Sequence, residues 1–240
     1  MRVPDLRLWY DNKCGLGHVM RCRTLERAWN RLGGSCKHGP SYRSGDIVVF
    51  DGYYFTNEQK HQVMQDGNIV VSYAEFAEPV VSNIIINQNL GAETYHYPFA
   101  DVQLLGVEYF HLRDELKSLV PTSGTEVFDC DSVNRSLSPL DFSVRMANAK
   151  AVICASGLTA YESIYLGKPT LLRMVAENQK LTHTMLLKRG WAYPATADNI
   201  ARAYVGFAFE APSPKTLVDG NGADRVAKQI LEYWKAGRPA

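Results

Sequence analysis

A single histidine stands between a glycine turn and a helix near the start of the chain. In the stretch DNKCGLGHVMRC, Gly15 and Gly17 flank one residue and His18 follows directly. An imidazole titrates near neutral pH, so a histidine that faces a substrate can accept a proton. The positive end of a helix dipole disfavours a protonated imidazole, which would keep His18 neutral. We expect His18 to act as a general base; the alternative is a histidine that only closes a helix turn.

A second polar group follows an apolar run in the other half of the chain. The sequence ASGLTAYE brings Ser156, Gly157, Leu158 and Thr159 to the start of a predicted helix, with Glu162 one turn later. Free N–H groups at such a helix start can bind phosphate oxygens, and a carboxylate can accept hydrogen bonds from ribose hydroxyls. The alternative is a capping box, in which Thr159 and Glu162 bind only the helix's own amides.

Asp129-x-Asp131 points to a different chemistry. GT-A glycosyltransferases use this pattern to hold a divalent metal on the sugar diphosphate. The pattern is common by chance, however, and it does not follow a nucleotide-binding half of this chain. We therefore expect neither a metal site nor a redox cofactor, and activity that survives a chelator.

Composition excludes several classes of protein. The 240 residues are 46% hydrophobic and carry 26 Lys and Arg against 25 Asp and Glu. This balance offers no global charge excess that would attract nucleic acid or an acidic membrane. Five scattered cysteines do not form a disulfide framework or a zinc motif. Without a signal peptide or a long apolar segment, the chain is expected to be cytoplasmic, with no integral membrane segment.

The elements that must position these residues alternate between strands and helices. In the first half, strands are predicted within residues 6–10, 46–55, 68–74, 83–89 and 102–106, and helices from His18 to Gly33 and over 57–67. In the second half, strands are predicted over 149–156 and 168–175, and helices over 157–167, 184–190 and 223–237. Such alternation predicts α/β architecture with parallel sheets, whose ligands bind at the carboxyl ends of the strands.

A Ser, Pro and Asp-rich stretch between the two halves shows weak periodicity. It covers residues 116–141 and is typical of a boundary between two domains. We therefore expect an N-terminal Rossmann-like lobe over 1–118 and a shortened C-terminal nucleotide-sugar-binding lobe over 119–240.

Five separated motifs give the chain a family resemblance. They are similar, in the same order, to motifs of the UDP-sugar hydrolases of the pseudaminic acid pathway: GLGHVMRCRTLERAWNRLGG, VVFDGYYF, LLGVEYFHLRDEL, ASGLTAYESIYLGKPTLL followed by ENQ, and DGNGADRV. That family belongs with the GT-B type nucleotide-sugar enzymes, which include the N-acetylglucosaminyltransferase of the peptidoglycan lipid precursor. The resemblance implies two Rossmann-like lobes with a nucleotide sugar in the cleft between them.

The resemblance also implies roles for individual residues. It makes His18 the base, places Tyr53 near the reacting sugar, and assigns Glu162 to the ribose. It places Asn178 and Gln179 near the sugar, although on sequence alone these two are ordinary loop residues. For Tyr53, the alternative is a half-buried aromatic residue of a loop.

The chain also departs from the family. Family members open the second lobe with a strand, a Gly-Gly turn and a helix, and then add a further strand and helix. Here about 25 residues, 116–141, take that place, too few for two such units. A Gly-Gly loop facing the diphosphate is therefore missing, and SYAEFA lacks the paired aspartates expected after its strand. We expect a more open active site and cannot transfer the family's sugar specificity.

An open site favours a large acceptor over water. We therefore expect an inverting, metal-independent glycosyltransferase that moves a sugar, with UDP as the expected nucleotide, to a hydroxyl of a glycan, a lipid or a modified DNA base. DNA as acceptor would require basic residues clustered near the site; otherwise those residues only form solvated helix faces. One alternative is a UDP-sugar hydrolase, and another is an inactive nucleotide-sugar-binding module. The sequence does not indicate an oligomeric state.

Overall fold

The computed structural model describes residues 2–10, 16–132, 137–206, 209–211, 213 and 217–237. The chain divides into two compact units. Unit 1 comprises Met1–His111 and Asn221–Ala240, and unit 2 comprises Leu112–Gly220. Both are α/β, with parallel sheets and flanking helices compatible with a Rossmann-like fold.

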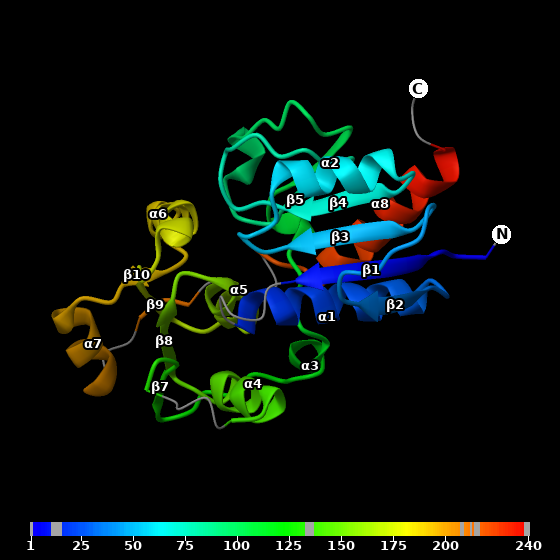
Figure 1. Ribbon diagram of the computed structural model, residues 1–240. Coiled ribbons are helices and arrows are strands. Elements are labelled where there is room, and N and C mark those ends of the chain that lie inside the picture. Colours follow the sequence, from blue (N-terminus) through cyan, green and yellow to red (C-terminus); the bar gives the residue numbers. More distant parts are fainter. Residues whose placement is uncertain are drawn as a thin grey trace. The chain divides into compact units, whose positions relative to one another are not determined.

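Unit 1 is built on a six-stranded parallel sheet in the order β2-β1-β3-β4-β5-β6 (Figure 1). The strands expected from the apolar runs are all present, and β2 was not predicted because Ser35–His38 is short and polar. The elements are β1 (Asp5–Tyr10), α1 (Leu16–Arg31), β2 (Ser35–His38), β3 (Ile47–Asp51), α2 (Asn57–Gln65), β4 (Ile69–Tyr73), β5 (Ile84–Asn87), β6 (Val102–Leu105), α8 (Gly222–Ala236) and the 3-10 turns η1 (Ala92–Thr94) and η2 (Val107–Tyr109).

Helices cover both faces of this sheet, so its central strands are apolar throughout. In β3, Ile47 and Val49 face the core shared with α1 and α8, whereas Val48 and Phe50 face α2. This alternation follows from the two-residue period of a strand. The polar residue that ends β3, Asp51, therefore marks the point where the buried run reaches the edge of the sheet.

The last helix belongs to unit 1 and not, as predicted, to a C-terminal lobe over 119–240. Helix α8 packs against α1, and its apolar stripe joins the same core. Arg31 of α1 also pairs with Asp224 of α8 at 2.8 Å. Sequence order alone could not reveal this return of the chain, because an amphipathic stripe does not say which sheet it covers.

Unit 2 has a four-stranded parallel sheet in the order β10-β9-β8-β7. Helices α5 and α7 lie on opposite sides of β8 and β9 (Figure 1), and α7 shares a small apolar core with Ile153 and Leu171. The elements are α3 (Asp114–Lys117), β7 (Val127–Asp129), α4 (Pro139–Ala147), β8 (Ala151–Ala155), α5 (Leu158–Tyr165), β9 (Thr170–Arg173), η3 (Glu177–Gln179), α6 (Lys180–Lys188), β10 (Tyr193–Pro194) and α7 (Ala197–Tyr204).

The stretch 116–141 is part of unit 2, and the division falls at Leu112 instead of after residue 118. The stretch contains β7 and the start of α4, whose N-cap Ser138 accepts a hydrogen bond from the backbone of Asp141. Serine, proline and aspartate are frequent in loops, but here they form a helix start. Among the described residues, no helix is long and apolar enough to span a membrane.

We predict that Gly222→Ala destabilises unit 1. A Cβ at Gly222 would overlap the backbone of Tyr109 and Phe110, which cannot move as a side chain could. Overpacking of this kind should lower the free energy of unfolding by roughly 1–3 kcal/mol. Urea unfolding followed by tryptophan fluorescence would measure the loss. Lys228→Ala, an exposed change on the same helix, should alter it by less than about 0.5 kcal/mol, and equal effects of the two changes would contradict the prediction.

Candidate functional site

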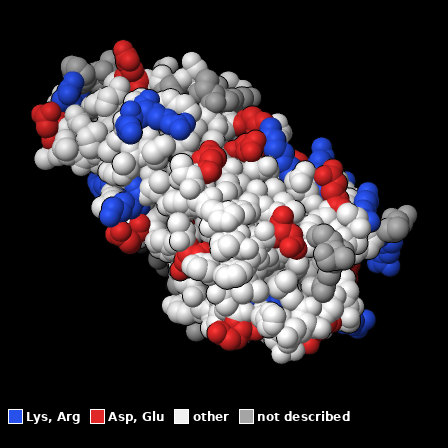
Figure 2. All heavy atoms as spheres, turned by 90° about the horizontal axis from the view of Figure 1, so that it is seen from above, with Lys and Arg blue, Asp and Glu red and all other residues white. Residues whose placement is uncertain are grey.

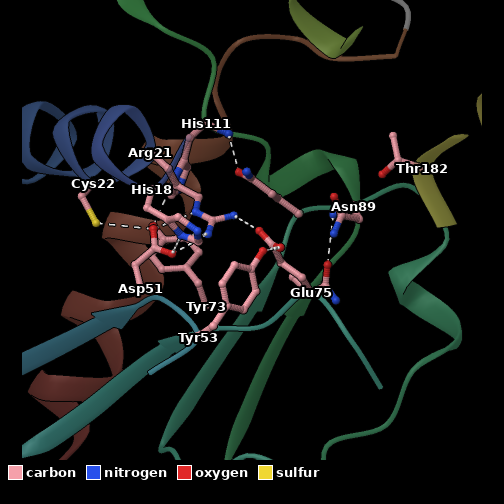
Figure 3. Close-up of polar contacts among 12 residues, drawn as sticks. His18, Arg21, Cys22, Asp51, Tyr53, Tyr73, Glu75, Asn89, His111 and Thr182 are labelled. Carbon is pink, nitrogen blue, oxygen red and sulfur yellow. Dashed lines mark hydrogen bonds and ion pairs between the residues drawn. The ribbon is translucent and has the colours of Figure 1, made fainter. Parts of the chain in front are cut away.

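Three polar side chains from separate segments meet at the carboxyl edge of the sheet in unit 1 (Figure 3). His18 lies in the first turn of α1, Asp51 ends β3, and Glu75 follows β4. Neighbouring parallel strands end at the same edge, so the topology brings the two carboxylates together. The edge thus combines a titratable imidazole with two acidic groups.

The buried pair of His18 and Asp51 defines the state of the imidazole. Nδ1 of His18 lies 2.6 Å from Oδ1 of Asp51, and the two residues are 6% and 0% exposed. An ionised carboxylate only accepts hydrogen bonds, so Nδ1 carries the proton and donates it. In the neutral form of the ring the lone pair is therefore on Nε2, which has no hydrogen bond to any residue that the structure describes. This arrangement suits a proton acceptor.

Arg21 keeps Asp51 ionised. Its Nε donates to Oδ2 of Asp51 at 2.8 Å, Nη2 donates to Oδ1, and Nη1 donates to Glu75 at 3.1 Å. Burial raises the pKa of Asp51, but the charge and hydrogen bonds of Arg21 and the hydrogen bond from His18 outweigh it and lower this pKa to about 2. Arg21 Nη2 also lies 3.1 Å from Nδ1 of His18. Because both atoms carry protons, this contact is not a hydrogen bond.

Tyr53 lies against the imidazole. Its ring meets His18 edge to face, with 5.2 Å between centroids, and its hydroxyl donates to Glu75 (Figure 3). The side chain is 47% exposed, so it also reaches solvent. Tyr53 is thus a partly exposed loop aromatic that also contacts the His18 ring.

A small pocket opens beside this cluster within unit 1. It has a volume of about 80 Å³, and its lining includes His18, Tyr53, Lys60, Glu75 and Glu78. The space admits several waters or one small polar group. Of the two glycines expected to form the turn before His18, Gly17 lies inside the first turn of α1 and Gly15 lies outside the described residues.

The Ser156 side chain is already engaged within unit 2. Its hydroxyl lies 2.8 Å from Nδ1 of His183 and donates to the carbonyl of Arg173 at 3.1 Å. Its backbone N–H also bonds to that carbonyl. Ser156 therefore does not offer a free N–H to a phosphate, because this N–H bonds to the carbonyl of Arg173 at the end of β9.

The start of α5 does offer backbone donors. Gly157 is the N-cap and no side chain caps the helix. No hydrogen bond from the N–H groups of Gly157, Leu158 or Thr159 reaches another described residue. Helix starts with open donors can bind anions. The Gln179 amide lies beside them, 3.8 Å from where a Cβ on Gly157 would be.

Glu162 makes a bidentate ion pair and no capping box. Arg113 Nε and Nη2 donate to its two oxygens at 2.6 and 2.7 Å, and Glu162 is 4% exposed. The capping-box alternative is wrong, since Thr159 lies inside the helix and not at its N-cap. The carboxylate keeps lone pairs beyond those that Arg113 uses.

Asn178 and Gln179 lie in the turn η3 after β9. Oε1 of Gln179 accepts a hydrogen bond from the backbone of Val175 at 3.2 Å. This bond orients the amide nitrogen of Gln179 away from Val175, on the side where Gly157 lies. The two sequence-predicted groups of unit 2, at the start of α5 and in η3, therefore lie together.

Both carboxylates of the Asp-x-Asp motif pair with one arginine. Arg173 donates to both oxygens of Asp129 at 2.9 Å and to Asp131 at 2.7 Å. The hydrogen bond from Arg173 lowers the pKa of Asp129, as a neighbouring cation should. A guanidinium thus occupies the place where a GT-A enzyme would hold a metal, and no metal-binding cluster is found in the described parts of the chain.

Sequence reasoning assigned no role to four residues of these clusters: Arg21, Asp51, Glu75 and Arg113. A weak signal existed for two of them. Arg21 is three residues after His18 and so shares its helix face, and Asp51 ends a fully apolar strand. No sequence pattern indicates Glu75 or Arg113, because their partners are distant in sequence.

We predict that Asp51 stabilises unit 1 most strongly above its unfolded pKa. The folded-state pKa of about 2 lies below the usual 3.8, so the contribution of about 2 kcal/mol is present above pH 5 and lost as the pH falls toward 2. Asp51→Asn should lower the free energy of unfolding at pH 7 by roughly 3–5 kcal/mol, because Arg21 loses a buried partner. It should also flatten the decline in acid.

Urea unfolding from pH 7 to pH 3, followed by tryptophan fluorescence, would measure both effects. Trp9, Trp29 and Trp234 all lie in unit 1. Asp198→Asn, an exposed change in unit 2, serves as the control. An Asp51→Asn protein as stable as this control at pH 7 would contradict the assigned role.

Comparison with known proteins leaves the family open. No family model matches the chain, and no curated protein matches its sequence. A function must accordingly be inferred from the chemistry of the two units.

Proposed function

We propose that this chain is a nucleotide-sugar-dependent glycosyltransferase, inverting and metal-independent, in which His18 is the general base. The proposal includes the GT-B arrangement, in which both units act on one nucleotide sugar, and UDP as the nucleotide. The observation that carries it is the buried pair of His18 and Asp51, with the bare Nε2 of His18 beside a pocket.

The proposed reaction needs one base and a stabilised leaving group. Nε2 of His18 takes the proton of the acceptor hydroxyl while its oxygen bonds to the anomeric carbon. The bond from that carbon to the diphosphate breaks, and the nucleoside diphosphate leaves with the electron pair. Asp51 stabilises the resulting imidazolium, as the carboxylate does in other His–Asp pairs. Asp51 is fully buried, so it is not a nucleophile, and a single displacement inverts the anomeric centre.

Unit 2 supplies the groups proposed to bind the donor. The open N–H groups at the start of α5 and the Gln179 amide support an assignment to the diphosphate and sugar. Glu162, oriented by Arg113, is assigned to the ribose hydroxyls. Metal independence is supported by the pairing of Asp129 and Asp131 with Arg173.

Nucleic acid is the least supported acceptor among the three expected. Several basic residues that might contact phosphates are engaged elsewhere: Arg21 with Asp51, Arg31 with Asp224, Lys168 with two backbone carbonyls, and Arg173 with Asp129. On the face drawn in Figure 2, basic and acidic side chains are interspersed. Polyanion binding would need a continuous basic surface.

Hydrolysis is the second candidate. The pocket beside His18 has a volume of about 80 Å³, which suits water better than a whole acceptor sugar. The same base serves water or an alcohol, so only the nucleophile differs.

Release of nucleoside diphosphate from a panel of UDP, GDP and TDP sugars in the presence of chelator would test the proposal. We expect release only when a suitable acceptor from a pool of glycans, lipids and modified DNA is present. Release without acceptor would establish the hydrolase instead. Binding without any release would indicate an inactive binding module.

We predict that His18→Gln lowers turnover by about 10²–10⁴-fold and leaves the affinity for the nucleotide unchanged. Glutamine keeps a polar side chain but cannot accept the proton. Steady-state rates with the active donor and calorimetric titration with its nucleoside diphosphate would measure the two effects. Exposed His61→Gln on α2 is the matched control and should leave both values unchanged. Turnover of His18→Gln at the wild-type rate would rule out His18 as the base.

Glu162→Gln tests the donor side. It should weaken UDP at least about tenfold, while a 2′,3′-dideoxy analogue should lose little affinity, because only the ribose hydroxyls donate to the carboxylate. Calorimetric titration of both nucleotides would measure the difference. Equal losses of affinity for both nucleotides would show that the ion pair of Glu162 and Arg113 only stabilises the fold.

A further inference from the structure

One cation of the pocket beside His18 has no partner among the residues that the structure describes. Lys60 lies on α2, is 7% exposed and lines this pocket together with His18. No hydrogen bond or ion pair within the described chain reaches its amine. Glu78 acts on it only at longer range. The amine is therefore a strong hydrogen-bond donor that the fold leaves open.

Such a lysine destabilises the fold unless something binds it. Taking an ammonium out of water is unfavourable, and a buried lysine is normally paired. Burial lowers the pKa of Lys60, against an opposing effect of Glu78. A methionine or leucine would fill this position on α2 at lower cost in free energy. The retained amine therefore indicates a ligand.

The remaining charges of the pocket are largely satisfied by one another. Arg21 donates to Asp51 and Glu75, His18 donates to Asp51, and Tyr53 donates to Glu75. Glu78 is exposed, so water screens its charge. Lys60 is thus the charged group of this pocket whose hydrogen bonds a ligand can complete.

We propose that this pocket recognises a compact anionic group, a carboxylate or a phosphate, on the hydroxyl compound that His18 deprotonates. This inference rests on the proposed function, because it names the chemical class of the acceptor. The volume of about 80 Å³ fits such a group and no larger part of the acceptor. The acceptor hydroxyl then lies at Nε2 of His18 while the anion lies at Lys60.

Binding of three probes that share one ring tests this directly, with no donor present. D-glucuronate and glucose 6-phosphate carry an anion that D-glucose lacks, and the first two separate carboxylate from phosphate. Calorimetry or ligand-observed NMR should show at least one anion bound about tenfold or more tighter than glucose. Lys60→Met should abolish this preference, whereas Lys228→Met, an exposed change on α8, should keep it.

Thermal unfolding of the same variants separates recognition from a structural role. Lys60→Met should be as stable as the wild type or more stable, since it removes a buried, unpaired charge. Lys60→Gln provides a polar second variant. If both variants unfold at clearly lower temperature, Lys60 balances the charges of Asp51 and Glu75 and the proposal is wrong. Equal affinity for all three probes, or no binding of any, would also overturn it.

The binding test of Lys60 does not depend on turnover, so failure of the anion site and failure of the proposed reaction can be told apart. Suppose that nucleoside diphosphate is never released, but the preference for anions is present and is lost in Lys60→Met. The anion site at Lys60 is then correct and the proposed reaction is wrong. If release depends on an acceptor but neutral acceptors serve as well as acidic ones, the reaction stands and the anion site is wrong.

Discussion

The carboxylate of Asp51 is the group around which the site in unit 1 is arranged. It is fully buried at the end of an apolar strand, so it must be neutralised where it stands. Arg21 supplies the charge and His18 supplies a further hydrogen bond. One consequence is structural, because α1 is tied to β3. The other is chemical, because the contact with Asp51 places the proton of a neutral His18 ring on Nδ1 and the lone pair on Nε2.

Carboxylates are also neutralised by arginines in unit 2. Buried Glu162 is matched by Arg113, and the Asp129 and Asp131 pair is matched by Arg173. Asp51, Asp129 and Arg173 each end a strand of a parallel sheet, where the apolar run stops. A charged partner lets a carboxylate stay ionised there, and the hydrogen bonds between the two groups fix its orientation.

Much of the secondary structure could be predicted from apolar runs, and the structure confirms the strands of unit 1 except β2 and the helices α1, α2, α5 and α8. The helices α4 and α7 were missed for identifiable reasons: α4 begins with residues typical of loops, and α7 shows its apolar stripe only over eight residues. The short elements α3, β7 and β10 were not predicted either. In the candidate site, His18 and Tyr53 could be named from the sequence and do lie in contact. Their roles in a reaction remain proposals.

The sequence by itself determined where the longer apolar strands and most of the amphipathic helices occur, because the two-residue and 3.6-residue periods are local properties. It also determined that His18 starts a helix. Only the tertiary structure decided which distant residues pair: Asp51 with His18 and Arg21, and Arg113 with Glu162. It also decided that α8 packs in unit 1. These are pairings between distant segments, and the energy of a buried charge depends on which segments fold against it.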